Sequence, residues 1–94
     1  MRHPGGGASA AKFWPAALWC GWPPRLKGWW CYIVTRESSA RPDAVNRSSG
    51  CYGLMQLAPC HWAARGRAWI RDVFNQLRLA WQLYREEGAS PWGL

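Results

Sequence analysis

Apolar residues recur at helical spacing between residues 27 and 38. They share one helix face and are Trp30, Ile33 and Val34. The same count places Glu37 on that face, in the last turn. We expect the helix to end before Pro42, because a residue that precedes proline disfavours helical geometry. The pattern therefore predicts a helix that directs a carboxyl group toward the core.

A second apolar stripe lies near the C-terminus and continues on one helix face as far as Glu86. It consists of Trp69, Ile70, Val73, Phe74, Leu77, Ala80, Trp81 and Tyr84. Gly88 suits the position just beyond a helix, and Asp72 suits the positive helix end if the regular part begins there. Between the two helices lies a Gly- and Ser-rich loop that ends in a short helix or turn over 53–57. The expected fold is mostly α, with two principal helices around this loop.

Residues 1–27 are rich in proline and glycine and show no sustained period, which predicts a loosely ordered arm. Residues 28–94 form the one small domain that this length allows. The arm's tryptophans either pack on the domain or act as surface anchors. No segment is apolar and long enough to span a membrane, and the N-terminus does not match a secretory signal peptide.

Nine tryptophans among 94 residues supply the bulk of the core and leave rings that can stack on sugars, bases or lipid interfaces. The net charge of +7 predicts attraction to nucleic acid, an anionic cell envelope or anionic lipid, or simply a solvated basic surface. The four cysteines have neither a C-x-x-C pair nor a histidine at ligand spacing, so no metal site or cofactor is expected. They are buried thiols or disulfides. A bond from Cys31 to Cys51 or Cys60 would staple the first helix to the loop.

Withdrawing a carboxyl group from water favours its neutral form, which would raise the pKa of Glu37 toward neutrality. A protonated carboxyl group near neutral pH is what a general acid requires. Alternatively, Glu37 folds back onto Arg36 or Arg41 as an exposed charge at the helix end. The residues that follow Glu37 favour the acid.

Those residues form a recognisable block. It comprises Glu37-Ser38, Pro42, Ala44-Val45-Asn46, Ser48-Ser49-Gly50, Gly53-Leu54-Met55-Gln56-Leu57, Pro59 and Trp62. The chain closes with Trp81, Tyr84, Gly88 and Ser90-Pro91-Trp92. Over about 29–92 it resembles the lytic transglycosylase and goose-type lysozyme superfamily. The resemblance implies a small lysozyme-like domain.

The resemblance also implies an activity, that of a peptidoglycan lytic transglycosylase. Such an enzyme cleaves the β-1,4 bond between N-acetylmuramic acid and N-acetylglucosamine, and Glu37 would act first as acid and then as base. By the same resemblance, Asn46 orients the acid, and Ser48, Met55 and Gln56 line the saccharide subsites. Tyr84 matches an aromatic residue near the cleft. Gln76 departs from the family, which often has Asn there.

Glycosidases commonly use two carboxyl groups, whereas a transglycosylase can use a single one because the substrate supplies the nucleophile. Besides Glu37, only Asp43 lies on the loop, where it could activate water. Asp72 is interpreted as a helix-start charge, and Glu86 and Glu87 as solvent-facing. We therefore expect a transglycosylase rather than a lysozyme-like hydrolase.

Two binding functions compete with this prediction. Arginine mixed with tryptophan suits single-stranded nucleic acid, and a chain that keeps the fold without turnover would serve as a wall-binding or virion structural protein. The preferred hypothesis has peptidoglycan glycan strands as partner, no nucleic acid, and a monomer. It places the protein in the cell envelope, the periplasm or outside the cell, including a phage lysin or virion.

Overall fold

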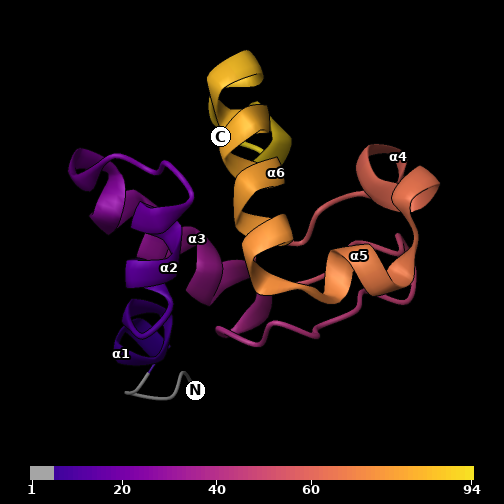
Figure 1. Ribbon diagram of the computed structural model, residues 1–94. Coiled ribbons are helices and arrows are strands. Elements are labelled where there is room, and N and C mark those ends of the chain that lie inside the picture. The colour runs from indigo at the N-terminus through magenta and orange to yellow at the C-terminus, as the bar shows by residue number, and fades with distance from the viewer. Residues whose placement is uncertain (1–5) are drawn as a thin grey trace.

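The computed structural model describes the backbone of residues 6–94 and the side chains from Ser9 onward (Figure 1). Its helices are α1 (Gly6–Ala11), α2 (Trp14–Trp19), η1 (Pro24–Leu26), α3 (Lys27–Ser38), α4 (Pro59–Trp62), η2 (Ala63–Arg65), α5 (Arg67–Arg71), α6 (Val73–Glu87) and η3 (Ser90–Trp92). Among the described residues there is no regular strand, and isolated bridges pair Tyr52 with Val45 and with Leu57. The predicted mostly α fold, with α3 and α6 as its longest helices, is confirmed.

Helix α3 has the predicted bounds and buries the predicted apolar face. It ends at Ser38, as predicted, and the chain then reverses before it reaches Pro42. Ser39 and Ala40 adopt left-handed backbone angles, with φ of 53° and 61°. The Ser39 amide donates to the Thr35 carbonyl at 3.0 Å, which closes the last turn of the helix. Because non-glycine residues occupy this region at a cost, the surrounding contacts must hold the reversal in place.

The C-terminal apolar stripe forms two helices rather than one. Asp72 is extended, with φ of −71° and ψ of 122°, and separates α5 from α6. Its Oδ1 atom accepts hydrogen bonds from the backbone amides of Phe74 and Asn75, at 2.8 and 3.2 Å. Gly88 ends α6, with its amide donating to the Tyr84 carbonyl at 2.8 Å. Asp72 is therefore the N-cap of α6, as the helix-start interpretation predicted.

The prediction of a loosely ordered arm does not hold for residues 6–26, and residues 1–5 lie outside the described part. Helices α1 and α2 form there, α1 packs on α3, and α2 packs on α6. Trp14 and Trp22 are buried, whereas Trp19 is 80% exposed. Sequence periodicity missed these helices because each spans less than two turns, which is too short for a pattern to repeat.

Aromatic rings join the N-terminal helices to the rest of the core. The Trp22 ring packs against the rings of Trp81 and Tyr84, with centroids 5.1 and 5.7 Å apart. The Trp29 ring in turn packs against Tyr84 at 5.0 Å and against Trp92 at 5.5 Å. Figure 1 shows α6 between α2 and α3 on one side and α4 and α5 on the other. Tryptophan is thus the main core material, as its abundance predicted.

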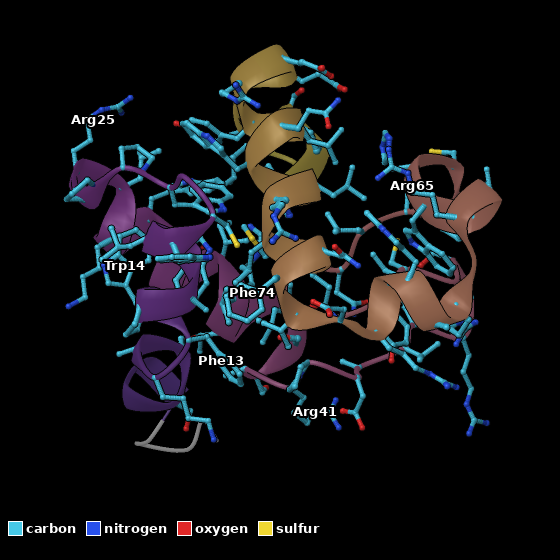
Figure 2. The ribbon with its side chains drawn as sticks, in the orientation of Figure 1. Phe13, Trp14, Arg25, Arg41, Arg65 and Phe74 are labelled. Carbon is cyan, nitrogen blue, oxygen red and sulfur yellow. The ribbon has the colours of Figure 1, made fainter. Side chains whose placement is uncertain are left out.

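The basic side chains are distributed around the molecule. Arg25, Arg41 and Arg65 project on three different sides, from η1, the loop after α3 and η2 (Figure 2). In the part of the chain that the structure describes, no helix has the length and apolar character needed to cross a bilayer.

Candidate active site

Glu37 lies in the last turn of α3, and its side chain is 23% exposed. The Nε and Nη2 atoms of Arg36 both donate to Glu37 Oε2, at 3.1 and 2.7 Å. The expectation that the carboxyl group would be withdrawn into the core is therefore wrong. Its observed partner is the one that the alternative interpretation named, and this ion pair lies at the edge of the core rather than in it.

Arg36 has further contacts. Its Nη2 atom donates to the backbone carbonyl of Trp92 in η3, and its guanidinium group lies 5.8 Å from the centroid of the Tyr32 ring. The hydrogen bond to Glu37 is the main cause that raises the pKa of Arg36 above its ordinary value. The guanidinium group thus bridges the end of α3 and the C-terminal turn.

Ser38 connects α3 to the turn over 53–57. Its side chain is buried, and its Oγ atom lies within hydrogen-bond distance of the carbonyl oxygens of Leu54, at 2.8 Å, and Val34, at 3.1 Å. The serine that follows the acid is therefore a structural link. Through it, the end of α3 is held directly against the turn that contains Gln56.

Gln76 supports the same turn from α6 and was missed as a site residue by the sequence analysis. Its buried amide accepts a hydrogen bond from the Leu54 backbone amide at 2.9 Å and donates to the carbonyls of Pro42 and Ile70, at 2.8 and 3.0 Å. Gly53 packs so closely on this amide that a Cβ atom would collide with it. The sequence feature that could have identified Gln76 is its position as a polar residue within the apolar face of α6, next to Leu77.

The side chain of Gln56 is fixed by the turn itself. Gln56 adopts a left-handed conformation, with φ of 53°, and its Nε2 atom donates to the carbonyls of Ala44 and Gly53, at 3.0 and 3.1 Å. No hydrogen bond to its Oε1 atom occurs among the described residues. Gln56 can therefore offer an acceptor to a sugar hydroxyl group at a fixed position.

Met55, the neighbour of Gln56, is buried at 1% exposure. Its carbonyl oxygen accepts a hydrogen bond from Trp92 Nε1 at 2.8 Å, which ties η3 to the turn. Because the side chain packs in the core, only the Met55 backbone remains as the part of this residue that can border a subsite.

Asn46 and Ser48 lie on the exposed part of the loop. The Oδ1 atom of Asn46 accepts hydrogen bonds from the backbone amides of Ser48 and Ser49, at 2.9 and 3.1 Å. This geometry stabilises a tight turn. The structure gives Asn46 a role in shaping the loop, and no hydrogen bond joins it to Glu37 among the described residues.

Tyr84 lies in the aromatic cluster. Its ring contacts those of Trp22, Trp29 and Trp81, with centroid distances of 5.7, 5.0 and 5.9 Å. It is partly buried and supports Trp29, which packs on Trp92. These contacts give Tyr84 a place in the core, consistent with its position in the apolar stripe.

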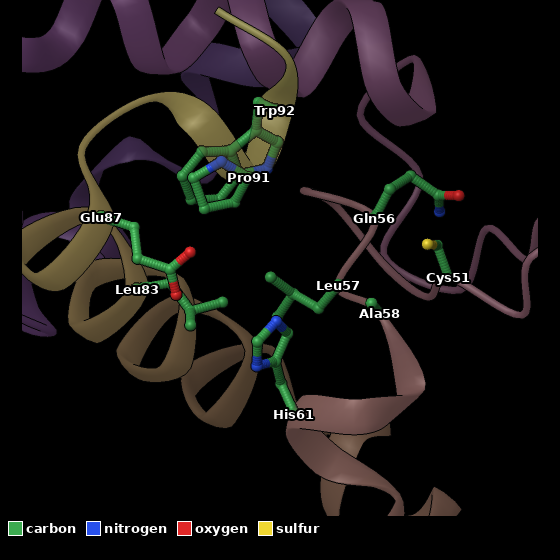
Figure 3. Close-up of a pocket in the computed structure, with 9 residues that line it drawn as sticks. All are labelled: Cys51, Gln56, Leu57, Ala58, His61, Leu83, Glu87, Pro91 and Trp92. Carbon is green, nitrogen blue, oxygen red and sulfur yellow. The ribbon is translucent and has the colours of Figure 1, made fainter.

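A pocket of about 140 Å³ lies between the turn over 53–57, the start of α4 and the end of α6 (Figure 3). Leu57 and Trp92 form part of its apolar wall, and His61 from α4 and Glu87 from the end of α6 also line it. Gln56 also lines it. Glu37 does not line this pocket and is connected to it through Arg36 and the Trp92 carbonyl.

Comparison with known proteins identifies this arrangement. Residues 27–78, which extend from the start of α3 into α6, match the family described as the transglycosylase SLT domain. The chain belongs to this family. The match includes Glu37, the loop, the turn that contains Gln56, and Gln76, which are the elements that the hydrogen bonds above bring together.

The transglycosylase domain also has a named relative. A protein called probable transglycosylase IsaA, from Staphylococcus epidermidis, is 35% identical over 65 residues, which are 69% of this chain and 25% of that protein. The chain therefore spans about a quarter of the relative's length. No solved structure shows a significant match.

The other carboxyl side chains of this transglycosylase domain lie on the loop and at the two ends of α6. Asp43 is exposed on the loop, and Asp72 is committed to capping α6. Glu86 accepts a hydrogen bond from Gln82 at 3.2 Å on the exposed end of α6. Glu87 is exposed, as the solvent-facing interpretation predicted, and its carboxyl group also lines the pocket.

The four cysteines of the transglycosylase domain are free thiols in the structure, so the stapling disulfide is absent from the described residues. Ser38 and Gln76 make the link between helix and loop that such a bond would have made. Burial is the main cause that raises the pKa of the Cys20 and Cys31 thiols. Among the described residues, no group of His, Cys, Asp and Glu side chains is suited to hold a metal ion.

Proposed function

We propose that this chain is a peptidoglycan lytic transglycosylase in which Glu37 is the single catalytic acid and base. The observation that carries the proposal is the contact between Ser38 and Leu54, which holds the end of α3 against the turn over 53–57. Within a domain of the SLT family, this contact places the carboxyl-bearing helix end beside the turn that offers Gln56.

The proposed reaction needs no water and no second carboxylate. Glu37 gives its proton to the oxygen that links C1 of N-acetylmuramic acid to the next sugar, and the C1–O bond breaks with its electron pair going to that oxygen. The C6 hydroxyl oxygen of the same muramic acid then bonds to C1. Its proton passes to Glu37, so the acid is restored and a 1,6-anhydro end is formed.

The surrounding residues have separate proposed roles. Gln56 accepts a hydroxyl group of the glycan through Oε1, and the Met55 backbone borders the adjoining subsite. Asn46 and Ser48 shape the loop, and from the loop they can contact the glycan strand. The Trp29 ring packs against Trp92, and Tyr84 packs against Trp29 in turn.

The test is digestion of purified peptidoglycan by the wild type and by Glu37→Gln, with mass spectrometry of the products. We expect anhydro ends from the wild type and a loss of about 10²–10⁴-fold in rate for the variant, as is typical for removal of a general acid. An active Glu37→Gln enzyme would refute the proposal.

Two further variants separate a transglycosylase from a hydrolase. Asp43→Asn and Glu87→Gln each remove a carboxyl group that could activate water, the first on the loop and the second in the pocket. We expect both to keep forming anhydro ends. Reducing ends from the wild type, lost in either variant, would show a hydrolase.

Binding without turnover remains the competing function, with nucleic acid or the wall as partner. Steep salt-dependent binding of oligonucleotides, unaffected by Glu37→Gln, would support it. The contact that holds the end of α3 against the turn over 53–57, within a domain of the SLT family, favours the enzyme. As an enzyme, the protein would act as a monomer at the cell envelope or outside the cell, where a phage lysin also acts.

A further inference from the structure

The two carboxyl oxygens of Glu37 have different surroundings. Both hydrogen bonds from Arg36 go to Oε2, and none goes to Oε1 among the described residues. Arg36 is itself held by the Trp92 carbonyl and lies over the Tyr32 ring. One oxygen of the carboxyl group is thus fixed, and the other is available.

The pair contributes little to stability. Adjacent residues on a helix do not face each other, so both side chains must bend to meet. The side chains are 35% and 23% exposed, and exposed ion pairs are screened by solvent. An arrangement with three hydrogen bonds from one guanidinium group therefore calls for another explanation.

We propose that Arg36 is a positioning residue that holds Glu37 through Oε2 and leaves Oε1 as the oxygen that donates the proton. This inference rests on the proposed function. The Trp92 carbonyl fixes the guanidinium group in turn, so η3 determines where the acid is held.

The arrangement is compatible with a protonated acid. A carboxyl group that carries its proton on Oε1 still accepts hydrogen bonds at Oε2, so Arg36 can stay in place before and after proton transfer. When the proton leaves, the guanidinium group stabilises the negative charge that develops. A correctly oriented donor also removes part of the entropy cost of reaching the reactive geometry.

The experiment compares Arg36→Gln, Arg36→Lys and Glu37→Gln on solubilised glycan strands. Arg25→Gln is the matched control, because Arg25 projects outward from η1 and its removal costs the same charge. We expect Arg36→Gln to lower kcat about 10–100-fold, with KM changed by less than about twofold. Arg36→Lys should recover part of kcat, because lysine keeps the positive charge but lacks the paired N–H donors of the guanidinium group. Arg25→Gln should match the wild type.

Melting temperatures separate positioning from folding. A change below about 5 °C for Arg36→Gln is expected, which corresponds to about 1 kcal/mol in a domain of this size. A larger loss would overturn the inference, because lower activity would then follow lower stability. Full activity of Arg36→Gln, or a rise in KM at constant kcat, would overturn it too. If Glu37→Gln remains active, the proposed function fails; if it is inactive while Arg36→Gln is fully active, only the role of Arg36 fails.

Discussion

Gly53 and Gln76 meet at a contact that leaves no space for a side chain on residue 53. The Gly53 backbone has φ of 86°, and a Cβ atom there would lie 2.5 Å from the carbonyl carbon of the Gln76 amide. The oxygen of the same amide accepts a hydrogen bond from the Leu54 backbone amide. The side chain of Gln76 thus joins α6 to the turn that contains Gln56.

We expect Gly53→Ala to destabilise the protein by about 1–3 kcal/mol, because it adds a strained conformation and a steric collision. Urea denaturation measures the change. Gly28→Ala is the control, since Gly28 lies in α3 with no atom within 4 Å of the added Cβ, and alanine favours a helix. Equal loss in both variants would show that the contact with Gln76 does not decide the effect.

At the scale of single residues, the sequence predicted Glu37, Met55 and Gln56 as site residues but did not predict the groups that hold them. The positions of the predicted residues follow from a helix count and a recognisable block. Arg36 was considered only as an alternative partner of Glu37, and its link to the Trp92 carbonyl joins residues 56 positions apart. No local pattern reports such a contact.

Helix α6 begins where Asp72 interrupts the apolar stripe. Removing the Oδ1 atom would leave the amides of Phe74 and Asn75 without their side-chain acceptor. We expect Asp72→Ala to lower stability by about 1 kcal/mol, equivalent to about 4–8 °C in melting temperature for a small domain. Thermal unfolding followed by circular dichroism would measure it.

Asp72→Asn is the matched variant for this helix, because asparagine caps as well as aspartate while carrying no charge. Stability close to the wild type in Asp72→Asn would assign the effect to the cap. A loss as large as that of Asp72→Ala would instead assign it to the charge at the positive helix end.

Among the elements, the long helices were predictable and the short ones were not. Repetition of an apolar face over several turns identified α3 and most of α6. The break at Asp72 and the helices α1 and α2 are decided by caps and by packing on neighbours, which leave little periodic signal.

At the scale of the whole molecule, the N-terminal segment packs on both long helices, α1 on α3 and α2 on α6. Trp22 is buried, its ring contacts Trp81, and its Nε1 atom donates to the Leu77 carbonyl at 3.0 Å. We expect Trp22→Ala to cost about 3–5 kcal/mol, a large part of the stability of a domain of this size. Chemical denaturation would measure it.

Trp19→Ala provides the comparison, because Trp19 is on the same N-terminal segment and is 80% exposed. Its effect should stay within about 0.5 kcal/mol, as for other surface substitutions. If Trp22→Ala were equally mild, residues 6–26 would be attached only loosely to the rest of the domain.

The sequence by itself determined the helical class, the two principal helices, the place of Glu37 in the last turn of α3 and the family-like block around Gln56. Each of these depends on the spacing of neighbouring residues along the chain. Only the tertiary structure decided that Glu37 pairs with Arg36, that Gln76 supports the turn, and that the N-terminal tryptophans complete the core. These outcomes depend on atoms that packing brings together from distant positions, where partner, distance and burial are set by the whole fold.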